Sequence, residues 1–219
     1  MKPIANILKD NVPDELLSRW INQLKYAYSE AESISNNNFE KPESSNLLPY
    51  LFNSKADELL RRIAQDFPQI RVKVKKNDNN YQFTLLEFND IILTQKAIAS
   101  PGEMVKASEF RRALAIGNSV YCDDYIPPLF VDFPLFDDIN GEKIYGILTH
   151  NRSSAYKKNG FAFANIAFPD PTFKSYLFNI DLHEYCGAIT DQQVVDGITE
   201  IDDEITPKLK IKRIRENNA

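Results

Sequence analysis

The sequence predicts an α+β fold in which N-terminal helices pack on a largely antiparallel β-sheet. Amphipathic helical periodicity is concentrated before residue 68, whereas alternating strand patterns dominate from residue 70 onward. Strands and crossover helices do not alternate regularly, as they would in a doubly wound parallel sheet. We therefore interpret residues 1–190 as a single α+β domain (helical over 12–67, β-rich over 70–185) and residues 191–219 as a charged C-terminal segment.

Two helices are predicted in the first third of the chain. The first spans residues 14–32, where apolar residues recur every three or four positions. Residues 33–46 are rich in Asn and Ser and are interpreted as a loop. The second helix spans residues 55–67, with Ser54 and Asp57 forming a capping box at its start.

The remaining elements are predicted from turn signals and from alternation. A helix near residues 103–116 would be opened by Ser100 and Glu103 and closed by Gly117-Asn118. The Asn140-Gly141 dipeptide indicates a hairpin turn. The predicted strands are 70–75 and 81–85, which form a hairpin, then 91–98, 129–131, 143–149, 161–168 and 176–182.

Composition narrows the function classes. The chain has 219 residues, 43% of them hydrophobic, and a formal net charge of −5. No apolar run approaches the roughly 18 residues of a membrane span, and the N-terminus is too poor in apolar residues for a signal peptide, so we expect a cytoplasmic protein. Acidity opposes phosphate binding, which makes nucleic-acid binding the weakest alternative. Its only support is a basic hairpin face beside Tyr81, formed by Arg71, Lys73, Lys75 and Lys76.

All the cysteines and histidines of the chain form one candidate metal or nucleophile set: Cys122, His150, His183 and Cys186. His183 and Cys186 stand three positions apart, a spacing that lets both reach one zinc ion. Structural zinc sites usually have paired short spacings, which Cys122 and His150 lack. A Cys–His nucleophile has no local sequence support either. We therefore expect buried or ordinary residues here, and neither a metal nor another cofactor.

Acidic residues are concentrated between residues 123 and 142, directly before Lys143. Metal-dependent nucleases use clustered acids and a lysine in this way, so a metal-dependent hydrolase or nuclease is the main alternative function. Solvated loops have the same composition, and adjacent residues on a strand point to opposite faces. If the chain is an enzyme, the catalytic candidates are Asp124, Asp132, Asp138, Glu142, Lys143, His150 and His183.

A pair of arginines lies on the predicted 103–116 helix. Arg111 and Arg112 have the side chain that binds phosphate or carboxylate with two hydrogen bonds. The neighbouring Phe110 and Leu114 fit the inward face of an amphipathic helix, so we interpret the arginines as the exposed face.

The C-terminal segment has the most unusual charge pattern. Residues 191–204 contain six acids and no base, and a basic block follows. An extended arm with this pattern can add a strand to a partner protein, and its charges can set the register. The binding candidates are Lys208, Lys210, Lys212, Arg213 and Arg215.

Together these patterns predict a non-enzymatic interaction protein of bacterial or phage type. We expect it to bind and mask or regulate another protein, as immunity, antitoxin and defence-related proteins do. The acidic charge of the chain favours a basic protein partner. The patterns leave the oligomeric state open.

Overall fold

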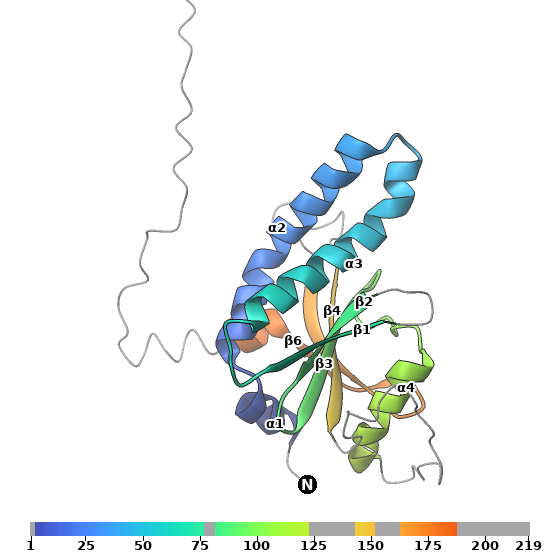
Figure 1. Ribbon diagram of the computed structural model, residues 1–219. Helices are drawn as coiled ribbons and strands as arrows, with labels where there is room; N and C mark the ends of the chain where they lie inside the picture. Colours follow the sequence, from blue (N-terminus) through green and yellow to red (C-terminus); the bar gives the residue numbers. More distant parts are fainter. Residues whose placement is uncertain (1–2, 77–81, 123–142, 152–162, 188–219) are drawn as a thin grey trace, which may run out of the picture.

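The computed structural model describes residues 3–76, 82–122, 143–151 and 163–187 (Figure 1). Three helices come first, and a six-stranded, mostly antiparallel sheet follows, which confirms the α+β class. The elements in chain order are α1 (Ile4–Asn11), α2 (Asp14–Asn38), α3 (Glu43–Ala64), β1 (Arg71–Lys76), β2 (Gln82–Glu87), β3 (Ile91–Ala97), α4 (Glu109–Ala115), the 3₁₀ helix η1 (Ile116–Tyr121), β4 (Ile144–Asn151), β5 (Phe163–Pro169) and β6 (Tyr176–Asp181).

The sheet keeps the order of the chain, β1-β2-β3-β4-β5-β6. Every neighbouring pair is antiparallel except β3 and β4, which run parallel from Ile91 opposite Ile144 to Ala97 opposite His150. The sheet is therefore two antiparallel meanders, β1–β3 and β4–β6, joined along one parallel seam. Because β3 and β5 flank β4, a hairpin at Asn140-Gly141, which lies outside the described residues, does not supply a neighbour of β4.

Strands β3, β4 and β5 are buried on both faces of the sheet, whereas β1 and β6 at its edges are partly exposed. Successive side chains of a strand point to opposite faces. Ile91, Leu93 and Leu148 pack with α1, α2 and α3 in the larger core. Ile92 and Tyr145 point the other way and pack with α4 and the segment before it in a smaller core. The molecule thus has three layers, with the N-terminal helices on one face and α4 on the other.

Helices α2 and α3 form a long antiparallel hairpin, and its residues show where the sequence prediction was wrong. The loop predicted over residues 33–46 is confined to a short turn, because α2 continues to Asn38 and α3 begins at Glu43. Ser35 is buried, and its hydroxyl donates to the Ser44 carbonyl oxygen at 2.9 Å. Pairing between the helices therefore overrides the weak helix propensity of the Asn and Ser residues.

The structure differs from the helix predictions in three further places. Sequence reasoning missed α1, whose Ile4, Ile7 and Leu8 are buried. The capping box at Ser54 and Asp57 is wrong, because both residues lie inside α3.

The predicted 103–116 helix is the third case. Glu103 Oε2 accepts hydrogen bonds from the amides of Ala99 and Ser100 at 2.9 and 3.1 Å, but this contact closes a turn at Gly102, whose φ is +79°. The helix begins only at Glu109, where the Ser108 hydroxyl accepts from the Arg111 amide. Gly117 and Asn118 lie inside η1 and do not close a helix.

Strand β4 lies at the centre of the sheet and is held by two special residues. A Cβ on Gly146 would lie 2.8 Å from Leu93 Cδ2 and 3.0 Å from Phe168 Cε1, so any larger residue would force these side chains to move. Asn118 of η1 is buried, accepts from the Tyr145 amide at 2.8 Å and donates to the Tyr145 carbonyl at 2.9 Å. These contacts fix η1 against the strand.

Candidate functional site

The four candidate metal ligands lie in the described part of the chain and do not form a metal site. His150 is on β4 and fully buried, whereas His183 is exposed on a helical turn over residues 182–187. Cys186 is buried in the larger core and Cys122 is half-buried after η1; neither forms a disulfide. Within the described residues, no three His, Cys, Asp or Glu side chains are placed to hold a metal ion.

His150 lies in a chain of buried hydrogen bonds that links four elements. Its Nε2 lies 2.8 Å from Gln95 Oε1, and its Nδ1 contacts the Tyr28 hydroxyl. Gln95 Nε2 donates to the Asn53 carbonyl at 3.0 Å and to Asp57 Oδ1 at 3.2 Å, which leaves Oε1 as the acceptor facing the histidine. The proton therefore sits on His150 Nε2, and Nδ1 accepts from Tyr28.

This network holds His150 neutral and gives it a structural role. Burial, assisted by the charge of Lys96, lowers the pKa of His150 to about 3. Trp20 packs edge-on against the imidazole, with 5.4 Å between ring centroids, and is itself fully buried. An imidazole sealed from water with both nitrogens engaged is suited to fixing α2 on the sheet and has no route to a substrate.

Of the catalytic candidates, the structure describes Lys143 and the two histidines. The Lys143 amine donates to Glu87 Oε1 at 2.8 Å and to the Phe88 carbonyl. Lys73 lies 3.0 Å from Glu87 Oε2. Burial alone would raise the pKa of Glu87, but its hydrogen bonds with Lys143 and Lys73 outweigh burial and hold the pKa below its usual range.

The acids Asp124, Asp132, Asp138 and Glu142 lie outside the described residues, as does the basic tail with Lys208, Lys210, Lys212, Arg213 and Arg215. The ion pairs of Glu87 weaken the case for nucleic-acid binding, because two residues of the basic hairpin face, Lys73 and Arg71, pair with this carboxylate at 3.0 and 3.9 Å. The basic face predicted for the first hairpin is therefore partly neutralised.

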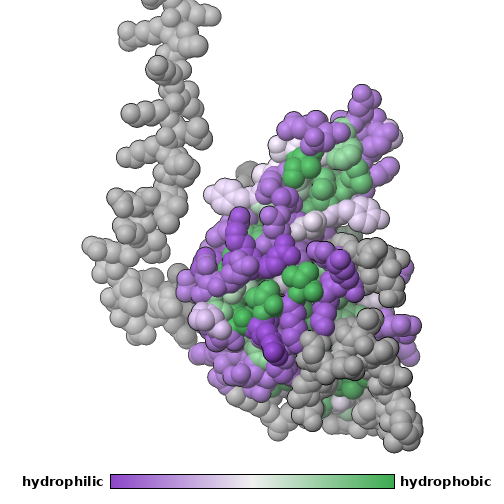
Figure 2. Space-filling view, viewed as in Figure 1, coloured by the Kyte–Doolittle hydropathy of each residue, from purple (hydrophilic) through white to green (hydrophobic). Residues whose placement is uncertain are grey.

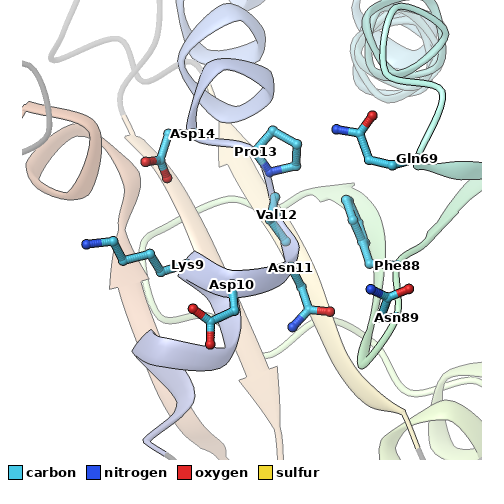
Figure 3. A pocket seen from close by; sticks show the side chains of 9 residues that line it. All are labelled: Lys9, Asp10, Asn11, Val12, Pro13, Asp14, Gln69, Phe88 and Asn89. Atoms are coloured by element: carbon cyan, nitrogen blue, oxygen red, sulfur yellow. The ribbon is translucent and has the colours of Figure 1, made fainter.

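A shallow cleft of about 400 Å³ lies where the α1–α2 corner meets the β2–β3 turn (Figure 3). Buried Val12 and Phe88 line it together with polar side chains such as Lys9, Gln69 and Asn89. Asn11, at the same corner, uses its amide to bind the backbone of Ile7 and accepts from the Asp90 amide at 2.9 Å. The cleft is thus a corner braced by its own hydrogen bonds.

The tip of the α2–α3 hairpin has a different character. Figure 1 shows the two helices continuing past the end of the sheet as a projecting pair. Tyr26, Phe39 and Tyr50 leave 65%, 42% and 70% of their surface exposed. Half-buried apolar residues lie near Tyr50 on the first turns of α3: Leu47, Leu48, Leu51 and Phe52. We call Phe39, Tyr50 and these four residues the hairpin tip; Tyr26 lies at the middle of α2 and is not part of it. Figure 2 shows apolar residues among polar ones towards the projecting end of the helical pair.

The surroundings of the hairpin tip are acidic. Between residues 30 and 52 the chain has four glutamates and one lysine, Lys41. Glu30 is paired with Lys55 at 2.7 Å, lower on α3. Glu40 and Glu43 are exposed beside the turn and have no ionic partner in the described part of the chain. Exposed aromatic side chains ringed by unpaired acids are typical of a binding surface.

Sequence reasoning missed this surface because it placed residues 33–46 in a loop. A signal was present in the sequence, because residues 47–52 form a run without any polar side chain: Leu47, Leu48, Pro49, Tyr50, Leu51 and Phe52. Such a run exceeds what one face of a helix can bury against a single neighbour.

Comparison of the chain with protein-family models, with curated proteins and with solved structures found no match. Among the helices that the structure describes, none is both long enough and apolar enough to pass through a membrane.

Proposed function

We propose that this protein is a non-enzymatic interaction protein of bacterial or phage type that binds and masks another protein through the hairpin tip. The observation that carries the proposal is the exposure of Phe39 and Tyr50 at the end of a helical pair that projects from the sheet. Exposed tyrosines supply large contact areas at a small cost in side-chain entropy, and they are enriched at the centres of protein interfaces.

The charge of the tip selects the partner chemistry. Glu40 and Glu43 would lie at the rim of the contact, where charges steer the encounter and set its salt dependence. The partner is therefore a protein with an apolar groove edged by Lys or Arg, into which the helical pair inserts. Masking follows from the geometry, since an inserted helical pair covers the groove that the partner uses for its own contacts.

Photo-crosslinking tests the proposed surface. A photoreactive phenylalanine analogue is placed at Tyr50 or, as a control, at Val120, an apolar residue of η1 that is 51% exposed. In extracts of the source organism, we expect one basic protein to be crosslinked from position 50 and not from position 120. Adducts that are equal at both positions would contradict the proposal.

Binding of the purified partner then gives the quantitative test. The variant Tyr50→Ser should bind about tenfold more weakly, because a truncated aromatic anchor costs on the order of 1–2 kcal/mol. Glu40→Lys/Glu43→Lys should slow association and reduce its dependence on salt. Lys9→Ser, at the opposite end of the helical layer, is the matched control and should bind normally. Unchanged affinity of the tyrosine variant would mean that the crosslinked protein does not dock on the tip.

A further inference from the structure

Lys96 is a half-buried cation on the face of the sheet that α4 covers. It follows Gln95, which points to the α3 side, so Lys96 points to the opposite side. Burial, and then the charge of Arg111, lowers the pKa of the Lys96 amine. No carboxylate of the described residues pairs with this amine.

Arg111 reaches the same region from α4. Its Nη1 donates to the Lys106 carbonyl at 3.2 Å, and the guanidinium hydrogen-bonds to the Tyr145 side chain. The Tyr145 hydroxyl lies 2.8 Å from Thr94 Oγ1, on the same face of β3 as Lys96. The Nε of Arg111 is buried and has no acceptor in the part of the chain that the structure describes.

Two acids on the same side of the sheet are already engaged. Glu103 accepts from the amides of Ala99 and Ser100, and Glu87 pairs with Lys73 and Lys143. Glu109, at the start of α4, is exposed. Lys96 and Arg111 are half-buried and have no counter-charge among the described residues. Two like charges partly removed from water destabilise a fold, unless an anion joins them or one of them loses its proton.

We propose that Lys96 and Arg111 bind a small oxyanion, a phosphate or carboxylate group, between β3 and α4. The guanidinium supplies charge-assisted hydrogen bonds in a planar fork, and the amine supplies a second, rotatable donor. The hydroxyls of Tyr145 and Thr94 complete a polar wall beside them. This site lies on the opposite face of the sheet from the hairpin layer and is independent of the proposed partner surface.

Anion titration of the full chain tests the site. Inorganic phosphate is added at pH 7 against sodium chloride of equal ionic strength, and calorimetry and thermal unfolding are recorded. A second series with acetate distinguishes a carboxylate ligand from a phosphate ligand. The variants are Lys96→Gln and Arg111→Gln, and the matched control is Arg112→Gln, which makes the same change at the next, exposed position of α4.

We expect saturable binding of one anion by the parent chain and by Arg112→Gln, together with a rise in Tm. Each of Lys96→Gln and Arg111→Gln should weaken binding by about tenfold or more. In chloride alone, Lys96→Gln should melt at or above the parent Tm, because it removes the repulsion within the pair, so loss of anion binding is not loss of folding. The NMR-detected pKa of the Lys96 amine should rise when the anion binds.

Binding of acetate alone would support the site as a carboxylate site. Absence of saturable binding of either anion by the parent chain would overturn the proposal, and so would parent-like affinity in Lys96→Gln and Arg111→Gln. If neither anion binds, the lowered pKa of Lys96 would instead mean that the fold accommodates this amine by letting it lose its proton more readily.

Discussion

Each nitrogen of His150 has one partner, and that arrangement suits only the neutral ring. Protonation of Nδ1 would direct an N–H at the Tyr28 hydroxyl and place a charge in a core with no acid in contact with the ring. The low pKa of His150, about 3, expresses this cost. Its partners lie 122 and 55 positions away in the chain, so sequence reasoning could mark the histidine as unusual but could not identify its role.

The resulting prediction concerns stability in mild acid. The unfolded chain binds a proton at His150 near pH 6.5 and the folded chain does so only near pH 3, so stability falls as the pH drops through this window. Between pH 7.5 and pH 5 this one group should cost about 2 kcal/mol of unfolding free energy. Urea titrations of the parent and of His150→Gln measure it. The variant should lose this part of the pH dependence; equal slopes would show that His150 is protonated in the fold.

At the scale of elements, α3 is attached to the sheet by a buried carboxylate. Asp57 accepts from the Thr84 amide at 3.0 Å, from the Thr84 hydroxyl at 2.7 Å and from Gln95. Sequence reasoning interpreted Asp57 as part of a helix cap, because a polar residue three positions after a serine fits that motif. The motif depends on a helix start at residue 55, and pairing with α2 moves that start to Glu43.

Asp57→Asn should therefore destabilise the protein by about 2–4 kcal/mol. The Asp57 carboxylate faces the donor groups of Thr84 and Gln95, and the NH₂ group of asparagine cannot accept their hydrogen bonds. Glu58→Gln is the control at the next position. Glu58 pairs with Lys55 at 2.9 Å on the surface, where such pairs contribute less than about 1 kcal/mol. Chemical unfolding of both variants checks the difference. Similar losses in the two would mean that the Asp57 contacts are no stronger than a surface ion pair.

At the scale of the whole molecule, the fold class could be predicted because helical and alternating periods occupy separate parts of the chain. The strands at 70–75, 81–85, 91–98, 143–149, 161–168 and 176–182 each correspond to a strand of the sheet. The parallel seam could not be predicted, because the local sequences of β3 and β4 do not indicate that these two strands are neighbours. The exposed hairpin tip could not be predicted either, because its exposure depends on how far α2 and α3 extend past the sheet.

The C-terminal segment gives a prediction at this scale. The apolar residues from Ile198 onward are spaced among charged ones, which is a poor pattern for a core, so we expect deletion from Ile198 onward to leave Tm within a few degrees of the parent. The deletion should also weaken partner binding if the basic block acts as a binding arm, as its charge pattern predicts. Thermal unfolding and a binding titration check both. A truncated chain that melts far below the parent would show that the segment belongs to the core.

The parallel seam between β3 and β4 also has a consequence for how the chain folds. Neighbouring strands within each meander need only short connections, whereas Ile91 and Ile144 close a loop of about fifty residues, whose entropy must be lost before the seam is rewarded. We therefore expect the pairs within each meander to form before the seam between β3 and β4 does. Gly146 lies on that boundary, where a Cβ would be 2.8 Å from Leu93 Cδ2 of the other half, so a larger residue at this position would disturb the packing between the two halves.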